Sequence, residues 1–320
     1  MRALVTGGNG FVGSAVVRAL LAQGWEVACL VRPQSDLRNL QGLEVALIPG
    51  DLEDPSSLRR ALPGCQHLYH VAAFYSPRPE DAQRLWRINV EGTRHLLHAA
   101  AEAGLERIVH TSTIGTIGRP PEGRLPTEED PFTAWETASP YVRSKLEAER
   151  LALELAHRGA PVVVVNPCAP VGAGDLKPSS TGARIVAYLQ GREPSFLPGG
   201  INFISVEDVA QGHLLAAQRG QIGARYILGH AQGNLRREDF YALMEAVSGV
   251  KPPVVRHGGL RGTLRALLRR GSAGTPAAGH QPFALTADPG RAIRELGLPQ
   301  TPLEIAFRQA VAWFRAHGYI

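Results

Sequence analysis

Short apolar runs alternate with longer amphipathic stretches through the first half of the chain. The apolar runs predict β-strands, and apolar positions spaced three and four residues apart predict α-helices. Strands are expected at 3–6, 26–31, 44–48, 67–70, 107–111 and 161–166, and helices near 11–23, 55–62, 81–103 and 139–158. The unbroken valine run at 162–165 is typical of a strand buried on both faces. This alternation predicts βαβ units and a parallel sheet.

The pattern changes after Asn166. A Pro- and Gly-rich passage at 166–172 leads to an expected helix near 180–190, a strand near 202–206, a helix at 207–219, a strand at 225–228 and an amphipathic helix at 302–317. Residues 271–282 predict a loop, because Gly, Ala and Pro dominate them. We therefore expect an α/β fold with a larger part, 1–167 with 202–230, and a smaller part, 168–201 with 231–320.

Composition limits the class of protein. The 320 residues, 44% apolar and 20% charged, can bury the core of one or two globular domains. No stretch approaches the roughly 20 apolar residues that cross a bilayer, and a glycine-rich stretch begins at residue 7, so we expect a cytoplasmic protein. Three separated cysteines without a CxxC pair predict buried thiols. The histidines lack metal-ligand spacing, so no metal site is predicted.

The net charge of +5 is unevenly distributed. Arginines between residues 256 and 270 supply it, with no acidic residue among them, so the rest of the chain is neutral and no nucleic-acid-binding face is expected. Leucines and arginines of this segment occupy different faces of a predicted basic amphipathic helix. Two interpretations stay open: leucines packed on the core with a solvated arginine face, or weak contact with an anionic membrane surface or a substrate phosphate.

A glycine-rich loop, Gly7-Gly8-Asn9-Gly10-Phe11-Val12-Gly13, joins the first strand to the first helix. A loop in this context is typical of a dinucleotide site. Gly7 permits a tight turn, Gly10 lets backbone N–H groups approach a pyrophosphate at the helix N-terminus, and Gly13 allows close packing of helix and strand. Phe11 and Val12, in the first helical turn, are expected at the same site.

The second strand ends in Arg32-Pro33 rather than in an acidic residue. A carboxylate there would accept hydrogen bonds from the adenosine ribose hydroxyls, whereas a guanidinium pairs with a 2′-phosphate. The sequence therefore favours NADP, with NAD possible, and Arg38 lies near enough to assist. The alternative is a solvated surface arginine. After the third strand, Asp51 is placed to accept from the adenine amino group, beside Leu52.

Tyr141 and Lys145 are four residues apart at the start of a predicted helix, so they share one helical face. A phenol ionises at about pH 10 in water, and a nearby ammonium lowers that pKa, as proton exchange with a substrate hydroxyl requires. Lysine is scarce in this chain, which strengthens the signal. Ser112 and Thr113 end the preceding strand, where a hydroxyl can orient a substrate oxygen toward Tyr141.

Together these motifs resemble the extended short-chain dehydrogenase/reductases, the NAD-dependent epimerase/dehydratase family. The resemblance covers the whole chain and rests on Gly7-x-x-Gly10-x-x-Gly13, His70-Val71-Ala72-Ala73, Asn89-Val90-Glu91-Gly92-Thr93, Thr111-Ser112-Thr113, Tyr141-x-x-x-Lys145 and Asn166-Pro167. The end of the second strand and the segments 166–172 and 313–319 are most similar to hopanoid-associated sugar epimerases and dihydroflavonol 4-reductases.

The resemblance implies a fold and a set of catalytic roles. The larger part is implied to be a Rossmann-type doubly wound parallel sheet that binds the dinucleotide, and the smaller part a mixed C-terminal substrate lobe. Tyr141 is implied as the acid/base and as a contact of the cofactor, with Lys145 binding the nicotinamide ribose and lowering the tyrosine pKa. Thr113 matches the family's substrate-orienting hydroxyl better than Ser112 does.

The resemblance also implies further cofactor contacts and a partner. Ala72 and Ala73 are expected beside the nicotinamide phosphate, and Pro167 and Cys168 beside the nicotinamide ring. A homodimer is expected through the helices near 81–103 and 139–158.

Two departures from the family pattern bear on the reaction. Ile114-Gly115 follow Thr113 where sugar-nucleotide dehydratases carry an acid pair, so dehydration is disfavoured. Ile117-Gly118 stand where many sugar epimerases have Tyr-Gly, which weakens that alternative. We therefore expect reduction of a small-molecule ketone or aldehyde, with epimerisation of a sugar or sugar nucleotide as the alternative. A non-catalytic dinucleotide sensor is a third hypothesis, against which an intact Tyr–Lys pair argues.

Aromatic residues follow the fourth predicted strand, in the loop Phe74-Tyr75-Ser76-Pro77-Arg78. They could stack on a substrate ring or pack within a lid, and the sequence leaves both interpretations open.

Overall fold

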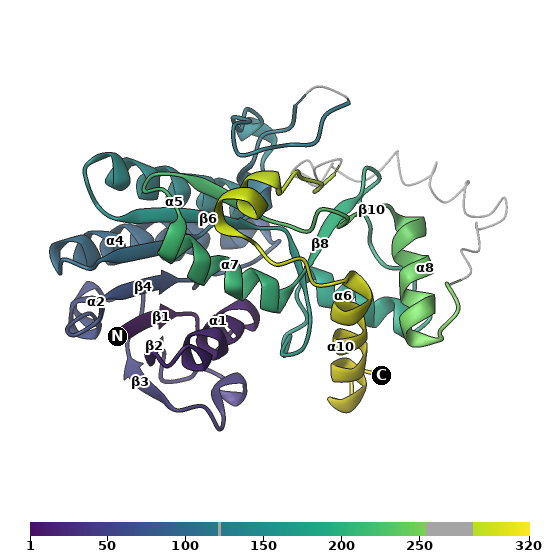
Figure 1. Cartoon of the computed structure of the whole chain (residues 1–320), viewed down its shortest axis with the longest axis horizontal. Helices are drawn as coiled ribbons and strands as arrows, with labels where there is room; N and C mark the ends of the chain where they lie inside the picture. Colours follow the sequence, from purple (N-terminus) through teal and green to yellow (C-terminus); the bar gives the residue numbers. More distant parts are fainter. Residues whose placement is uncertain (121–122, 254–283) are drawn as a thin grey trace.

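A parallel sheet of seven strands forms the core of the larger part of the chain (Figure 1). The computed structural model describes residues 1–120, 123–253 and 284–320. The spatial order of the strands is β3-β2-β1-β4-β5-β6-β9, and all neighbours are parallel. Their bounds are β1 (Arg2–Thr6), β2 (Glu26–Val31), β3 (Val45–Pro49), β4 (His67–His70), β5 (Arg107–Thr111), β6 (Val162–Pro167) and β9 (Arg225–Leu228). The order reverses between β1 and β4, whose carboxyl ends flank the crevice in which ligands of such sheets bind.

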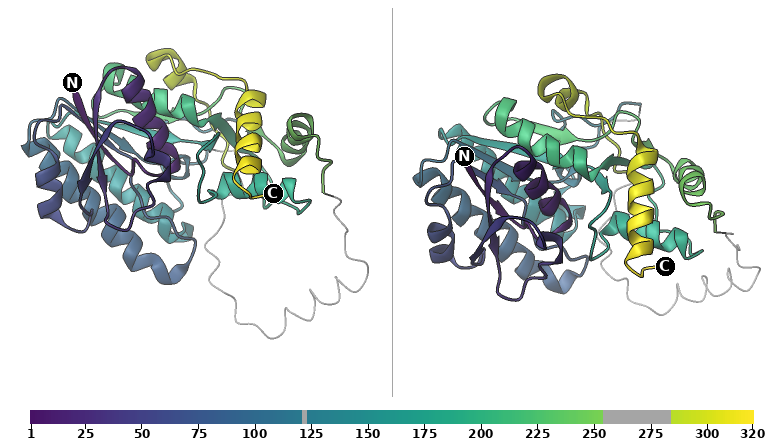
Figure 2. Two further views of the ribbon diagram at one scale, coloured as in Figure 1. Left: turned by 90° about the horizontal axis from the view of Figure 1, so that it is seen from below. Right: turned by 60° about the horizontal axis from the view of Figure 1, so that its bottom comes forward.

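Helices cover both faces of this sheet (Figure 2). α1 (Phe11–Ala22) and α7 (Val206–Arg219) pack together on one face, whereas α2 (Pro55–Ala61), α4 (Thr93–Glu102) and α5 (Pro140–His157) cover the other. In β6, Val163 and Val165 join the apolar cluster of α1 and α7, and Val162 and Val164 join the opposite cluster. Both faces of the strand are buried, which explains why its sequence is apolar throughout.

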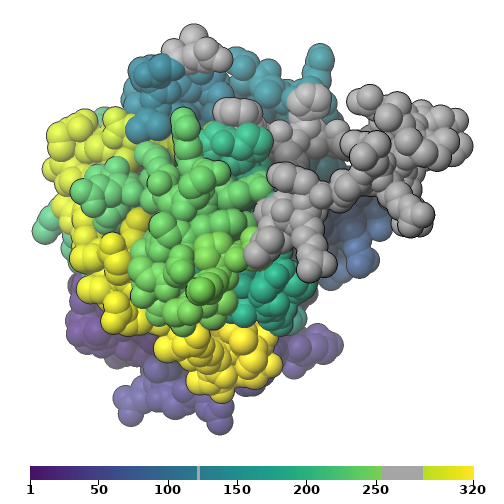
Figure 3. Space-filling view, turned by 90° about the vertical axis from the view of Figure 1, so that its right-hand side faces the viewer, coloured from purple at the N-terminus to yellow at the C-terminus, as the bar shows by residue number. Residues whose placement is uncertain are grey.

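Among the described residues of the smaller part, a three-stranded sheet packs with α-helices. β8 (Ile201–Ser205) pairs in parallel with β7 (Ala169–Val171) and antiparallel with β10 (Asn234–Leu235), so this sheet is mixed. α6 (Ser180–Leu189), α8 (Arg237–Ser248) and α10 (Leu303–Ala316) pack there around an apolar cluster that includes Phe203, Phe240 and Phe307. α8 and α10 adjoin each other at the surface of this part (Figure 3).

The predicted fold class is confirmed, since a Rossmann-type doubly wound parallel sheet is joined to a smaller, mixed sheet. The elements differ from the prediction in several places, and the short strands β7 and β10 are missing from it. The helix expected at 81–103 is interrupted: α3 (Ala82–Trp86) is followed by a π-helical turn (Arg87–Gly92) and then by α4. Helix α8 is missing from the prediction, because only Phe240 and Met244 of its residues are buried and their spacing alone gives a weak periodic signal.

The predicted boundaries of two domains, 1–167 with 202–230 and 168–201 with 231–320, stay a prediction. Within the segment 202–230, β8 pairs with the small sheet, whereas α7 and β9 belong to the layers of the large sheet.

The basic segment 256–270 and the expected loop 271–282 lie outside the described residues, so contact of that segment with an anionic surface stays a prediction. In the ranges that are described, no helix combines the length and the apolar character needed to cross a bilayer. Cys29, Cys65 and Cys168 are free thiols and are buried, as predicted.

Candidate active site

The glycine loop leaves the N-terminus of α1 open. Gly7 has φ +71°, and its carbonyl accepts a hydrogen bond of 2.9 Å from the Gly10 N–H. A Cβ on Gly13 would lie 2.0 Å from the Gly7 oxygen, so only glycine fits there. No side chain caps the helix, and Phe11 and Val12 form its first turn. The site therefore offers backbone N–H groups and a positive helix end to a diphosphate, and the residues fit a dinucleotide.

The end of β4 lies beside this loop, and the end of β3 lies two strands away at the same edge of the sheet. A Cβ on Gly7 would lie 2.7 Å from the Ala72 nitrogen, so the two backbones pack directly against each other. Ala73 is exposed, and Leu52 is buried. The Asp51 carboxylate accepts from the Glu53 N–H at 3.0 Å, which fixes the turn after β3. Each of these predicted cofactor residues lies at the carboxyl edge of the sheet, with Ala72 and Ala73 at the switch point between β1 and β4.

Arg32 lies exposed directly after β2, where the sequence predicts a phosphate contact. Ion pairing within the described part of the chain involves Arg38 but not Arg32. Arg38 donates to the Asp36 carboxylate at 2.6 Å and 3.1 Å, and this holds the pKa of Asp36 down to about 2. Arg32 is therefore the better candidate for a 2′-phosphate, whereas Arg38 would have to leave Asp36 to assist.

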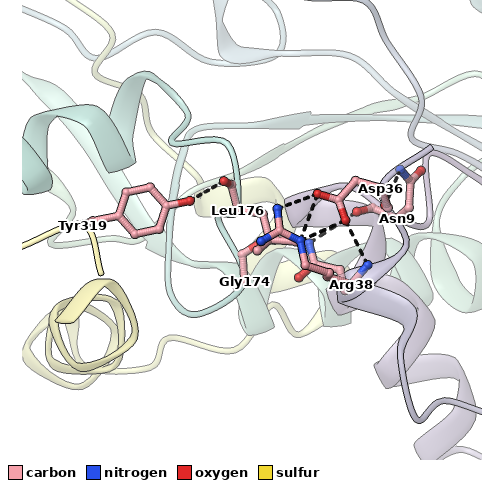
Figure 4. Close-up of polar contacts among 7 residues, drawn as sticks. Asn9, Asp36, Arg38, Gly174, Leu176 and Tyr319 are labelled. Atoms are coloured by element: carbon pink, nitrogen blue, oxygen red, sulfur yellow. Dashed lines mark hydrogen bonds and ion pairs between the residues drawn. The ribbon is translucent and has the colours of Figure 1, made fainter. Parts of the chain in front are cut away.

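Residues 174–176 connect the nucleotide side of the molecule to its C-terminal segment (Figure 4). The Asn39 amide donates to the Gly174 carbonyl at 2.9 Å and to the Asn9 carbonyl at 3.3 Å. On the other side, the Tyr319 hydroxyl donates to the Leu176 carbonyl. The glycine loop and the C-terminal segment of the smaller part are therefore joined by side-chain hydrogen bonds as well as by the chain.

Tyr141 lies in the first turn of α5, where Pro140 begins the helix and the Ser139 hydroxyl accepts from the Val142 N–H at 3.3 Å. Its ring is half-buried and meets the ring of Tyr75 edge to face, with 4.9 Å between the centroids. The helix start thus fixes the position of Tyr141 at the carboxyl edge of the sheet.

Lys145 lies one turn further along the same helix and is 2% exposed. Its Nζ donates to the Thr111 carbonyl at the end of β5, at 2.7 Å. Burial lowers the pKa of Lys145 to about 8, and the nearby carboxylate of Glu149 opposes this shift. The ammonium is therefore charged at neutral pH and loses its charge as the pH rises through about 8.

The pKa of Tyr141 differs from the expectation. The sequence predicts that Lys145 lowers it, but burial of the phenol raises the pKa above its usual value, and Tyr75 adds to the rise. Desolvation favours the neutral phenol, and the Lys145 ammonium is directed at a backbone carbonyl. Tyr141 is therefore a neutral hydroxyl at physiological pH, able to donate a proton.

Thr113 lies between β5 and a short helical turn (Ile114–Thr116). Its Oγ1 accepts a hydrogen bond of 3.2 Å from the Gly115 N–H, which leaves the hydroxyl proton available for another acceptor. Gly115 in turn lies against Val142 of α5, since a Cβ on it would be 3.5 Å from a valine methyl. The loop that carries Thr113 and the helix start that carries Tyr141 are therefore neighbours.

A buried carboxylate that the sequence reasoning missed holds this loop in place. Glu149, 2% exposed, accepts from the Thr116 hydroxyl at 2.7 Å, from the Asn166 amide at 2.8 Å and from Arg225 at 3.0 Å. The same Asn166 amide reaches the Thr113 carbonyl at 3.2 Å. The spacing of Tyr141, Lys145 and Glu149, each four residues apart on one helical face, is the signal that could have revealed it.

Pro167 and Cys168 end β6 and are buried. The Cys168 N–H donates to the Leu228 carbonyl at 2.9 Å, and burial raises the pKa of its thiol far above the usual value. Cys168 is therefore an inert, neutral thiol rather than a nucleophile, and its place beside the nicotinamide ring stays a prediction.

These features make the chain a dinucleotide-binding protein of the Rossmann class. Residues 3–229 match the model of the NAD dependent epimerase/dehydratase family, and the chain belongs to this family. The resemblance drawn from its motifs is thereby confirmed.

Relatives cover almost the whole chain. A Synechocystis sp. protein provisionally named a dihydroflavonol 4-reductase is 40% identical over 99% of this chain and 95% of its own length. "Sterol demethylase protein B" of Methylococcus capsulatus is 38% identical over 100% of both chains. The crystal structure of the UDP-glucose 4-epimerase of Thermus thermophilus in complex with NAD is similar, with a TM-score of 0.76, 27% identity and coverage of 98% and 99% of the two chains.

The family and its relatives are NAD(P)-dependent reductases, epimerases and dehydratases. The chain is accordingly an enzyme with a nicotinamide dinucleotide cofactor. The alternative hypothesis of a non-catalytic dinucleotide sensor is not supported, because the relatives are enzymes.

Proposed function

We propose that this enzyme is an NADP-dependent oxidoreductase that reduces a ketone or aldehyde on a small or ring-shaped molecule. The observation that carries the proposal is the pair of neutral hydroxyls near the start of α5. Burial raises the pKa of Tyr141, and Thr113 keeps its hydroxyl proton available. Two hydroxyl donors suit a carbonyl oxygen that gains negative charge and then a proton.

In this mechanism Thr113 donates a hydrogen bond to the carbonyl oxygen of the substrate, and Tyr141 transfers its phenolic proton to the same oxygen. The bound dinucleotide supplies the hydride that reduces the carbonyl carbon. The product is the alcohol, and Tyr141 is left as a phenolate. Lys145 can stabilise this negative charge only after its ammonium leaves the Thr111 carbonyl, to which it donates at 2.7 Å, and a proton from solvent then restores the phenol.

The remaining predicted residues are proposed to hold the cofactor. They share a position at the carboxyl edge of the sheet. They are Gly7, Gly10, Phe11, Val12, Gly13, Arg32, Asp51, Leu52, Ala72, Ala73, Pro167 and Cys168.

The reaction is tested by following the absorbance of reduced nicotinamide. We expect the purified enzyme to consume NADPH in proportion to alcohol formed when it is offered a panel of ketones and aldehydes. The same preparation is incubated with sugar nucleotides as the comparison. Interconversion of sugar epimers with no net change of cofactor would refute the reductase assignment.

Epimerisation of a sugar or sugar nucleotide is the second candidate. The same Tyr141, Lys145 and Thr113 would serve to oxidise and re-reduce a carbinol carbon. The likeness to a UDP-glucose 4-epimerase structure favours this candidate. Its first step needs a base that removes a hydroxyl proton and its second step repeats the reduction, so both candidates use the same proton exchange at Tyr141.

Arg32→Asp is expected to weaken NADPH binding about tenfold to a hundredfold, because a charge-assisted hydrogen bond is lost and a repulsive charge is added. NADH carries no 2′-phosphate, so its dissociation constant should change much less. Titration of both cofactors against wild type, Arg32→Asp and the exposed control Arg59→Asp measures this. Equal weakening of the two cofactors would rule out a 2′-phosphate contact.

We also propose that α4 and α5 form the interface of a homodimer. A groove of about 190 Å³ on these helices is lined by the half-buried Leu151 and Leu155 and the buried Leu97, together with Arg94, His98, Glu154 and Arg158. Half-buried apolar side chains among polar ones are compatible with a protein–protein interface.

A further inference from the structure

A fully buried histidine of α7 contacts the end of strand β5. The Nδ1 of His213 lies 2.7 Å from the Val209 carbonyl, one helical turn earlier, and its Nε2 lies 2.9 Å from the Thr111 hydroxyl. Burial lowers the pKa of His213 to about 4, so the ring is neutral at physiological pH. A carbonyl can only accept a hydrogen bond, so the single ring proton lies on Nδ1. Nε2 is therefore an acceptor, and the Thr111 hydroxyl donates to it.

The same threonine connects His213 to Lys145. The side chain of Thr111 lies on the face of the sheet that α7 covers, as the side chain of Val109 does. Its carbonyl accepts from Lys145 of α5, which covers the opposite face, at 2.7 Å. The hydroxyl bond holds the branched side chain of Thr111 in one rotamer and thereby restrains the strand end. Three elements are thus joined by hydrogen bonds through the edge of the sheet.

The charge of Lys145 depends on its neighbours. Burial lowers the pKa of Lys145 to about 8, and the carboxylate of Glu149 opposes this shift. The nearby imidazoles of His70 and His110 are neutral, because burial lowers their pKa values and the charge of Lys145 lowers them further. A hydrogen bond to the charged form of a group favours that form. The Thr111 carbonyl therefore helps to keep the buried ammonium charged, provided that it stays in place.

We propose that His213 is a positioning residue: by accepting the Thr111 hydroxyl, it holds the Thr111 carbonyl where that carbonyl anchors the Lys145 ammonium. This role rests on the proposed function, in which Lys145 stabilises the phenolate of Tyr141. His213 acts through Thr111 and lies on the side of the sheet opposite to α5. It thereby adds α7 to the elements that determine the properties of the site.

The test titrates Lys145 directly. The chain contains three lysines, Lys145, Lys177 and Lys251, so the full-length enzyme labelled with ¹³C at lysine Cε gives three lysine signals, and Lys145→Met identifies one of them. Without cofactor, the Lys145 signal of wild type should titrate with a midpoint at about 8. His213→Leu and Thr111→Val each remove the bond between these residues and should lower the midpoint by about one pH unit. His213→Gln should keep the wild-type midpoint, because its side-chain carbonyl can accept in place of Nε2.

A second hydroxyl–imidazole pair supplies the matched control. The Thr93 hydroxyl lies 2.9 Å from Nε2 of the buried His70, and Thr93→Val removes it without touching Thr111. This variant should leave the Lys145 midpoint unchanged. Thr111→Val is nearly isosteric, so it gives the answer even if His213→Leu does not fold. An unchanged midpoint in Thr111→Val, or an equal shift in Thr93→Val, would overturn the role of His213.

Turnover on the same proteins separates this role from the proposed function. A midpoint lowered by about one pH unit leaves about a tenth of Lys145 charged at pH 8 instead of about half, so kcat for carbonyl reduction at pH 8 should fall about fivefold in Thr111→Val. His213→Gln should stay within about twofold of wild type, and a loss equal to that of His213→Leu would count against the role of His213. If wild type reduces no carbonyl compound, the reductase function fails, whereas a lowered midpoint would still support the anchoring of Lys145.

Discussion

Tyr141→Phe is expected to lower kcat for carbonyl reduction by about a hundredfold to ten-thousandfold, because it removes the proton that the product alcohol requires. The phenylalanine ring keeps the edge-to-face contact with Tyr75 and fills the same space. The dissociation constant of NADPH should therefore stay within about twofold of wild type. Steady-state NADPH oxidation and cofactor titration measure the two quantities.

A second tyrosine provides the control for this substitution. The Tyr188 hydroxyl donates to the Val250 carbonyl at 2.8 Å inside the substrate lobe. Tyr188→Phe should cost about 1 kcal/mol of stability and leave kcat unchanged. Wild-type turnover by Tyr141→Phe would show that another group supplies the proton, and the assignment of Tyr141 would fall.

Arg225→Met is expected to lower the free energy of unfolding by about 3 to 5 kcal/mol, since it leaves the buried carboxylate of Glu149 without its cation. The Arg225 guanidinium also donates to the Glu128 carbonyl, so the substitution removes a second buried contact. Thr116 and Asn166 would still donate to Glu149. The expected loss in the free energy of unfolding therefore lies toward the lower end of that range. Urea unfolding followed by circular dichroism gives the value.

An exposed ion pair supplies the comparison. Arg158 contacts Glu154 at 2.5 Å, with side chains 68% and 42% exposed, so Arg158→Met should cost less than about 1 kcal/mol. Adding Glu149→Gln to Arg225→Met removes the unpaired charge and should restore part of the lost stability. A loss in Arg225→Met no larger than that in Arg158→Met would mean that the buried pair contributes no more than a surface pair.

The layers of the fold follow from local patterns, whereas its strand pairing does not. Apolar runs such as 162–165 indicate buried parallel strands wherever they occur. The strand near 202–206 is recognisable in the same way, but nothing in its residues shows that β8 joins β7 and β10 rather than the large sheet. The helix expected at 81–103 is interrupted at the turn that contains Asn89, whose side chain bonds to Phe74 in another segment, a contact that forms only after the chain has folded.

In the candidate site, too, residues placed by one helix could be predicted from the sequence, whereas residues placed by contacts between elements could not. Tyr141 and Lys145 stand out because one helix sets their spacing. The anchoring of Thr113 depends on Asn166 and Glu149, which come from other elements, so spacing could not reveal it. The direction of the Tyr141 pKa shift depends on how much water reaches the phenol, a property of packing that a list of neighbouring charges does not contain.

The hydrogen bonds of residues 174–176 to Asn39 and Tyr319 have a thermodynamic consequence. A ligand that displaces residues 174–176, whether it binds beside Asn39 or beside Tyr319, must stretch or break the hydrogen bonds on both sides of this segment. The two binding equilibria are then linked through it, and linkage is reciprocal: whatever factor the nucleotide adds to the affinity for the second ligand, that ligand adds to the affinity for the nucleotide.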